Sequence, residues 1–281
     1  MDQEIAAAYH RILGQLRRNA GYLARQEIDA ILEPIRLDTK RLEPYGFKVY
    51  SQNEEDGIIE EIFRRLNVEQ GRFCEIGVES GLECNSLYLI HKGWRGCWIE
   101  GNPKQRDRIE AKFASLIRNG RLRTAYSFVT AENINQIVKQ ALADVRDLDF
   151  FSIDVDGNDI YLMEAMEFFP KVICIEYNSK FPWSISKKPV YNPGNLWKGT
   201  DFMGASLLAL SEVASKKGYN LVATNITGSN AFFVRNDCLK NNFRNSSSIE
   251  HLYNPPRYWL TLDHFGQIGH PPDFGEYVDL M

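Results

Sequence analysis

Carboxylates lie at the ends of two successive apolar runs of the sequence, residues 148–154 and 171–177, or directly after them. Carboxylate and amide oxygens can coordinate Mg²⁺ or Ca²⁺. Alternatively, a carboxylate whose pKa is raised by its neighbours can act as a general base towards a hydroxyl without any metal. Both alternatives stay open at this level. The catalytic candidates are Asp154, Asp156 and Glu176, and the candidate metal ligands are Asp154, Asp156, Glu176 and Asn178.

A glycine loop follows an earlier apolar run, residues 72–77. Glu75, Gly77 and Gly81 have the spacing E-x-G-x-x-x-G, and glycines between a strand and a helix let the backbone approach a ligand closely. The dinucleotide motif G-x-G-x-x-G would need a glycine at position 79, where this chain has Glu. No Gly-Lys-Ser/Thr follows either. The loop therefore argues against a nicotinamide enzyme and excludes a Walker-type nucleotide site.

Glu100 ends the next apolar run, residues 96–100, and Asn102 follows it closely. A carboxylate at the end of the second strand of such a sheet can accept hydrogen bonds from both hydroxyls of a ribose. The glycine loop together with these strand-end acids predicts a cofactor that contains a nucleoside. A nucleotide-sugar or nicotinamide enzyme would also use the contact at Glu100, so it stays an alternative.

These side chains can act together only if the strand ends meet at one edge of a sheet. Apolar runs of strand length alternate with helical spacing, which predicts an α/β fold with a Rossmann-like parallel sheet covered by helices. Ser51 is the expected N-cap of the first of these helices, with Glu54 as its capping-box partner. The predicted strands are 72–77, 96–100, 122–128, 148–154, 171–177, 219–224 and 230–235, the last two as an antiparallel hairpin, and the predicted helices are 51–66, 84–91, 103–118, 131–143, 159–167 and 203–217.

Three segments lie outside this alternation. Residues 4–35 have helical spacing broken near Gly21, which predicts a helical hairpin. Residues 178–201 form an irregular loop whose aromatic side chains can stack on a sugar ring. The C-terminal tail is expected to be irregular and to reach over the site, where a histidine could serve as base. The loop candidates are Trp183, Tyr191, Trp197, Lys180, Lys187 and Lys188, the tail candidates are His264 and His270, and the predicted domain ranges are 1–43, 44–240 and 241–281.

The strings SQNEEDG (51–57) and SIDVDGND (152–159), with the glycine loop and Glu100, resemble the FkbM-like branch of class I S-adenosylmethionine-dependent methyltransferases. The resemblance covers about residues 45–236. It implies a seven-stranded sheet in the order 3-2-1-4-5-7-6, with the last strand antiparallel, and a cofactor at the carboxyl ends of the first strands. The cofactor-binding residues that it implies are Gln52, Asp56, Glu75, Gly77, Gly81, Glu100, Asn102, Ser127 and Asp154.

Composition limits the other possibilities. The chain has 281 residues and a formal charge of −4, so charge alone would not hold a nucleic acid. No apolar run approaches the length of a membrane span, the N-terminus does not resemble a leader peptide, and Cys74, Cys97 and Cys174 fall in apolar runs. These features predict a cytoplasmic protein in a reducing compartment, in which the N-terminal helices could form a homodimer contact.

The function expected from these observations is S-adenosylmethionine-dependent O-methylation of a hydroxyl on a carbohydrate or a similar polar small molecule. Mg²⁺ takes part only in the metal-assisted version. The alternative from another class is a non-catalytic module that keeps the methyltransferase fold and binds a ligand or a protein partner.

Overall fold

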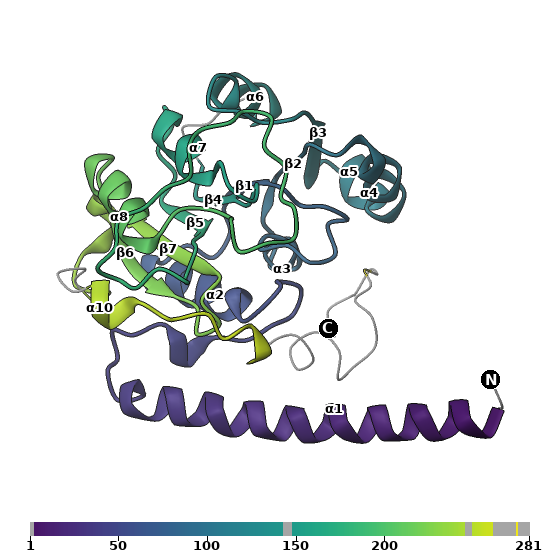
Figure 1. The fold of residues 1–281 in the computed structure, drawn as a ribbon. Coiled ribbons are helices and arrows are strands. Elements are labelled where there is room, and N and C mark those ends of the chain that lie inside the picture. Colours follow the sequence, from purple (N-terminus) through teal and green to yellow (C-terminus); the bar gives the residue numbers. More distant parts are fainter. Residues whose placement is uncertain (1–2, 143–147, 245–248, 261–273, 275–281) are drawn as a thin grey trace, which may run out of the picture.

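The computed structural model describes residues 3–142, 148–244, 249–260 and 274. Its centre is a seven-stranded sheet in the order β3-β2-β1-β4-β5-β7-β6 (Figure 1). β7 runs antiparallel to both β5 and β6, and the other neighbouring strands are parallel. The predicted strand order is confirmed. The strands are β1 Arg72–Ile76, β2 Arg95–Glu100, β3 Leu122–Tyr126, β4 Phe150–Ile153, β5 Val172–Glu176, β6 Tyr219–Thr224 and β7 Asn230–Arg235.

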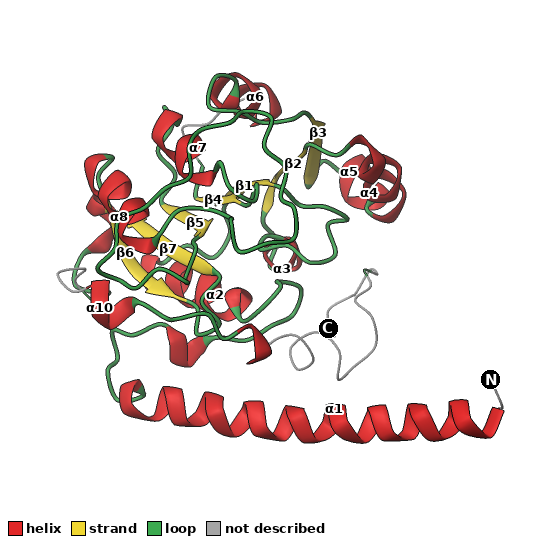
Figure 2. Cartoon of the chain, in the orientation of Figure 1, coloured by secondary structure: helices red, strands yellow, loops and turns green. Residues whose placement is uncertain are grey.

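Helices cover both faces of this sheet (Figure 2). On β1, Phe73 belongs to a core cluster that includes residues of α2, α3 and α4, whereas the next residue, Cys74, belongs to a second cluster that includes residues of α6, α7 and α8. Both side chains are fully buried, as expected for a parallel strand between two helical layers. The α-helices are α1 Gln3–Leu32, α2 Glu55–Leu66, α3 Leu87–His91, α4 Arg106–Lys112, α5 Ala114–Arg118, α6 Ile134–Leu142, α7 Asp159–Ala165, α8 Leu207–Lys216, α9 Asn236–Leu239 and α10 Ile249–Leu252, and the 3₁₀ segments are η1 Glu33–Ile35, η2 Glu43–Tyr45, η3 Pro103–Gln105 and η4 Tyr258–Leu260.

The N-terminal segment is a single helix, so the predicted hairpin is wrong. α1 continues through Gly21 without a break, because one glycine in a helix costs only about 1 kcal/mol relative to alanine and does not by itself end the helix. Near its C-terminal end, Ala24 and Ile28 pack against Ile226 and Leu260. Within the described part of the chain, no helix combines the length and the apolar character that a bilayer crossing requires.

The predicted capping box at the start of α2 is also wrong. The helix begins at Glu55, and the side chain of its N-cap residue, Glu54, makes no capping hydrogen bond. Ser51 Oγ instead accepts a hydrogen bond from the backbone N–H of Asp56 at 3.1 Å. Glu54 turns away from the helix and accepts from the backbone N–H of Ile226 at 2.5 Å. Glu54 therefore ties the start of α2 to the turn between β6 and β7.

Glu55 strengthens the same connection. Its side chain accepts hydrogen bonds from the amide groups of Asn53, Asn225 and Asn230 at 2.8 to 2.9 Å. Burial, together with the neighbouring Glu55, raises the pKa of Glu54 to about 8. Oε2 of Glu54 is buried and has no hydrogen-bond partner among the described residues, so the protonated form of Glu54 is favoured in the folded protein.

This raised pKa predicts how stability changes with pH. Because the pKa of Glu54 rises from 4.5 to about 8 on folding, its contribution to the free energy of unfolding is full at low pH and is lost as the pH rises through 8. We expect Glu54→Gln to be more stable than wild type at pH 9 by about 1 kcal/mol or more, with a smaller difference at pH 5. Urea unfolding at both pH values measures this. Glu167→Gln, at an exposed position, is the control, and equal pH dependence in wild type and Glu54→Gln would contradict the prediction.

Candidate acid cluster at the strand ends

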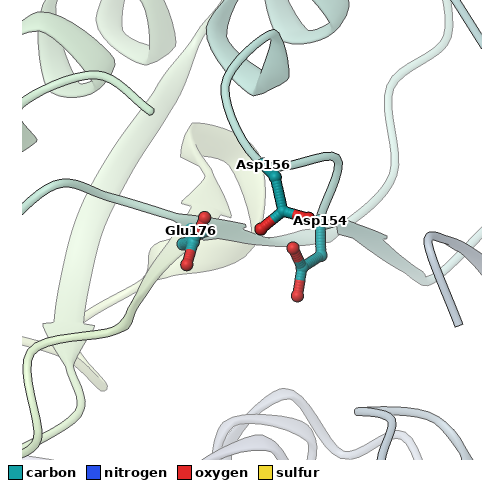
Figure 3. Close-up of side chains that lie close together, drawn as sticks. All are labelled: Asp154, Asp156 and Glu176. Atoms are coloured by element: carbon teal, nitrogen blue, oxygen red, sulfur yellow. The ribbon is translucent and has the colours of Figure 1, made fainter. Parts of the chain in front are cut away.

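Three carboxylates meet at the carboxyl ends of β4 and β5. Asp154 and Asp156 follow β4, and Glu176 is the last residue of β5. Each offers an oxygen atom, and these atoms all lie within 4.8 Å of one another (Figure 3). All three residues are partly exposed. The structure thus brings together the three residues that the sequence marks as catalytic candidates, and we call them the acid cluster.

Burial and mutual repulsion dominate the electrostatics of the acid cluster. Burial and the nearby Asp159 and Asp156 raise the pKa of Asp154 well above its usual value. The pKa of Glu176 is raised in the same way, by burial and then by Asp154. Oε2 of Glu176 is buried without a partner, and within the described ranges none of the three forms an ion pair. The acid cluster therefore favours either a bound proton or a cationic ligand.

Asp159 holds the turn that presents Asp156. Its carboxylate accepts hydrogen bonds from the backbone N–H groups of Val155 at 2.9 Å and Gly157 at 2.8 Å. Asp156 itself has a φ of 55°, in the left-handed region. Asp159 is fully buried, and burial raises its pKa to about 6. Asp159 therefore has a structural role, although it belongs to the same sequence string as Asp154 and Asp156.

Glu75 organises the loop between β1 and α3. One carboxylate oxygen accepts from the backbone N–H of Asn85 at 2.8 Å, and the other accepts from the N–H of Ser86 at 3.0 Å and from its hydroxyl at 2.5 Å. The side chain is buried. Both carboxylate oxygens of Glu75 thus already accept hydrogen bonds from the protein. Direct contact of Glu75 with a cofactor stays a prediction.

The two glycines of this loop are needed by the protein itself. A Cβ atom on Gly77 would lie 1.7 Å from the carbonyl oxygen of Asp154, and the φ of Gly77 is +83°. A Cβ on Gly81 would lie 2.6 Å from the ring of Trp98, and its φ is +76°. Gly77 thus permits the ends of β1 and β4 to approach each other, and Gly81 permits the loop to pack on β2. Their contact with a cofactor remains a prediction.

Glu100 links the loops that follow β1 and β2. Its carboxylate accepts from the backbone N–H of Glu79 and from that of Asn102, each at 2.7 Å. Each oxygen thus receives one hydrogen bond and keeps a lone pair for another donor. Ser127, just after β3, donates its backbone N–H to the carbonyl of Glu100 at 3.0 Å. The predicted ribose and adenine contacts therefore lie next to each other.

The other predicted cofactor residues have mainly structural contacts. Asp56 accepts from the backbone N–H groups of residues 49–51 at 2.6 to 2.9 Å. Asn102 is exposed, and its side chain accepts from the N–H of Lys104. Gln52 is exposed, and Lys48 Nζ contacts both the Gln52 carbonyl and Glu83, on the loop after β1. The segment around Gln52 therefore lies beside that loop.

Asn178 is also held by its surroundings. Its side-chain nitrogen donates to the carbonyls of Asp201 at 2.9 Å and Met203 at 2.5 Å, and its oxygen accepts from the N–H of Lys180 at 3.3 Å. These contacts close the base of the loop that follows β5. Its predicted role as a metal ligand is restricted to the remaining lone pair of the amide oxygen.

The loop candidates divide into anchored and exposed side chains. The hydroxyl of Tyr191 donates to Glu132 at 2.7 Å and accepts from the N–H of Ala131 at 3.2 Å, which pins the loop to the segment after β3. Trp183 and Trp197 are 40% and 51% exposed and are the stacking candidates left. Lys180 and Lys188 pair with Asp201 and Glu164, and His264 and His270 lie outside the described residues.

Sequence reasoning missed two residues of this region. Glu79, a non-glycine residue with a φ of 47°, donates its N–H to Glu100 and contributes to the raised pKa of Asp156. Asn195 donates to the carbonyl of Asp156 at 3.5 Å. Asn195 lies in the loop after β5, which has no periodic pattern, so the sequence could not predict its contact with Asp156. For Glu79, the available signal is an acidic residue at the position where the dinucleotide motif has a glycine.

Comparisons with known proteins give similarity of structure without similarity of sequence. No family model matches the chain, and no curated protein matches it in sequence. A candidate caffeoyl-CoA O-methyltransferase from Staphylococcus aureus has 16% identity and a TM-score of 0.45, over 77% of this chain and 99% of that one. An O-methyltransferase from Bacillus cereus in complex with S-adenosylhomocysteine has 15% identity and a TM-score of 0.40, over 75% and 88%. These likenesses assign no reaction and no ligand to the present chain.

Glu75 accepts hydrogen bonds from the protein, whereas Glu176 faces other carboxylates, so substitution by glutamine should change protein stability differently at the two positions. In Glu75→Gln the new amide group would face N–H and O–H donors, so we expect a loss of about 1–3 kcal/mol in the free energy of unfolding. Glu176→Gln removes repulsion within the acid cluster, so we expect unchanged or increased stability. Urea unfolding at pH 7 of the two variants and wild type compares them. A loss in Glu176→Gln as large as that in Glu75→Gln would show that Glu176 is structural.

Proposed function

We propose that the protein is an S-adenosylmethionine-dependent O-methyltransferase that acts on a hydroxyl of a carbohydrate or a similar polar small molecule. The observation that carries this proposal is the position of the acid cluster, at the ends of β4 and β5, which lie two and three strands away from β2 and Glu100 at the same edge of the sheet. In open α/β sheets, ligands bind at this edge. A ligand that spans the two sites needs a diol at one end and positive charge at the other.

S-adenosylmethionine meets both requirements. Its ribose hydroxyls would donate to Glu100, whose two oxygens each keep a lone pair. Its ammonium and sulfonium groups would offset the burial and the repulsion that together raise the pKa of Asp154. Ser127 lies beside Glu100 on the side where the adenine is expected. When bound, the cofactor supplies an electrophilic methyl group on sulfur.

The acid cluster also suits the proton transfer that O-methylation requires. A neutral hydroxyl is a poor nucleophile, and its proton must leave as the new oxygen–carbon bond forms. A carboxylate with a raised pKa is a better proton acceptor than an ordinary one. Asp156 or Glu176 would accept this proton, while Asp154 faces the cofactor. The protein then contributes mainly by aligning the acceptor oxygen with the methyl group.

A metal-assisted version uses the same residues. Asp154, Asp156 and Glu176 can each offer one oxygen, and the unpartnered Oε2 of Glu176 fits a cation. Mg²⁺ prefers octahedral oxygen coordination and usually keeps several waters, so three protein ligands are compatible with it. The ion would neutralise the acid cluster and acidify the acceptor hydroxyl. Within the proposal, this version and general-base catalysis by the carboxylates alone remain two routes to the same reaction.

The acceptor class rests on the loop after β5. Trp183 and Trp197 are the half-exposed aromatic side chains of the segment, and Asn195 links the segment to Asp156. Aromatic faces stack well on sugar rings, and a few polar groups then orient the bound molecule. Of the loop lysines, Lys180 and Lys188 are already paired with carboxylates, whereas Lys187 is exposed and would be the residue to meet a phosphate or carboxylate on the acceptor.

Titration calorimetry with S-adenosylhomocysteine tests the cofactor. We expect micromolar binding to wild type and at least about tenfold weaker binding, near 1.4 kcal/mol, to Glu100→Ala, because the variant loses the acceptor of the ribose hydroxyls. Asp107→Ala, which removes an exposed acid of α4, should bind like wild type. Absence of binding to wild type would favour a non-catalytic module that binds another ligand or a protein.

Thermal unfolding with Mg²⁺ separates the two catalytic versions. If the acid cluster holds Mg²⁺, millimolar Mg²⁺ should raise the melting temperature of wild type by about 2–4 °C, and Glu176→Gln should lose this shift. Because protons compete for carboxylates of raised pKa, the shift should be larger at pH 8 than at pH 6. A wild-type melting temperature that Mg²⁺ leaves unchanged would eliminate the metal-assisted version.

A further inference from the structure

Glu79 lies between Glu100 and the acid cluster, and the proposed function does not use its side chain. In the sheet, β1 separates β2, which ends at Glu100, from β4, which is followed by Asp154 and Asp156 (Figure 1). Glu79 belongs to the loop after β1, and its backbone N–H donates to Glu100 at 2.7 Å. This loop therefore borders the gap that a ligand must cross to reach from Glu100 to the acid cluster.

The carboxylate of Glu79 has no structural partner. Its side chain is exposed, and over the residues that the structure describes it forms no hydrogen bond or ion pair. Glu83, in the same loop, pairs instead with Lys48 at 3.4 Å. The loop is held by other contacts, such as that of the Gly77 N–H with the carbonyl of Ile99 at 3.0 Å. The charge of Glu79 is therefore available to a ligand.

This charge acts on both sides of the gap. Burial, and after it the charge of Glu79, raises the pKa of Asp156. Burial also raises the pKa of Glu100, and Glu79 is the charged group that raises it further. A cationic group in the space between Glu100 and the acid cluster would therefore be attracted to Glu79.

The residue type at position 79 indicates the charge of the ligand. In the dinucleotide motif this position is a glycine, where the backbone approaches a pyrophosphate closely. A carboxylate at the same position repels a pyrophosphate and attracts a cation. Glu79 thus favours a cationic cofactor over an anionic dinucleotide.

The reaction of the proposed function, on which this inference rests, removes a positive charge. S-adenosylmethionine carries its sulfonium between the ribose and the amino-acid part. On methyl transfer the bond between sulfur and methyl carbon breaks, and its electron pair stays on sulfur. A lone pair of the acceptor oxygen forms the new bond to carbon, and the hydroxyl proton passes to a carboxylate of the acid cluster. S-adenosylhomocysteine therefore keeps the same ribose, adenine and amino-acid groups but has a neutral sulfur.

We propose that Glu79 distinguishes the charged cofactor from its neutral product. With the ribose at Glu100 and the ammonium at the acid cluster, the sulfonium falls in the gap that the Glu79 loop borders. The carboxylate attracts a sulfonium and gives no such attraction to a thioether, so spent cofactor is exchanged for fresh cofactor. Because this attraction is lost during methyl transfer, Glu79 acts on binding and exchange and does not accelerate the chemical step.

Titration calorimetry of S-adenosylmethionine and S-adenosylhomocysteine with wild type and Glu79→Gln tests the proposal. The variant keeps the backbone N–H and the size of the side chain and removes its charge. The ratio of the two affinities, cofactor over product, should be about 3–10-fold smaller in Glu79→Gln than in wild type. A general disturbance of the loop would weaken both ligands alike and leave the ratio unchanged. Glu69→Gln, which removes an exposed acid near the opposite end of β1, should keep the wild-type ratio.

Salt dependence provides a second measurement. Because Glu79 is exposed, raising the salt concentration from about 0.05 M to about 0.5 M should lower the ratio more in wild type than in Glu79→Gln. An equal or larger ratio in Glu79→Gln, with both ligands still bound, would overturn this proposal and leave the proposed function intact. If neither ligand binds wild type, the proposed function fails, and the role of Glu79 fails with it.

Discussion

The close approach of β1 to β4 is the constraint on which the site depends. At the end of β1, Gly77 lies so near the carbonyl of Asp154 that no side chain fits between them. Because the strand ends meet here, the loop after β1 can reach Glu100 on one side while the acid cluster forms on the other. Glu75 stabilises that loop by accepting hydrogen bonds from the backbone N–H groups of Asn85 and Ser86.

The strand-end acids of this protein fall into two electrostatic classes. Glu75, Glu100 and Asp159 accept hydrogen bonds from backbone N–H groups, which offset part of the cost of burial. Asp154 and Glu176 mainly face other carboxylates, and their pKa values are raised further. The first class builds the loops, and the second is available to a cation, a proton or a substrate. Perturbed carboxylates without a structural partner are the usual mark of a functional site.

The two exposed regions of the molecule differ in how they are held. The loop after β5 is tied down at several points, by Tyr161, Tyr191 and Asn178 among others, and exposes aromatic side chains between them. Among the described residues, α1 packs against the rest of the molecule near its C-terminal end, and its other apolar side chains are exposed. The first arrangement suits recognition of a small molecule next to the acid cluster.

The sequence by itself determined the strand positions and the adjacency of Asp154, Asp156 and Glu176, because apolar periodicity and strand-end polarity are local properties. The order of the strands in the sheet was implied by the family resemblance of the motifs, and not by periodicity. Only the tertiary structure decided which acids are structural. Glu54 accepts a hydrogen bond from the turn between β6 and β7 and does not cap α2. Asp56 accepts hydrogen bonds from three backbone N–H groups of the loop that precedes α2. Such choices depend on which donors the fold brings within hydrogen-bond distance. Donors far apart in the sequence, such as Ile226 for Glu54, leave no local pattern from which they could be predicted.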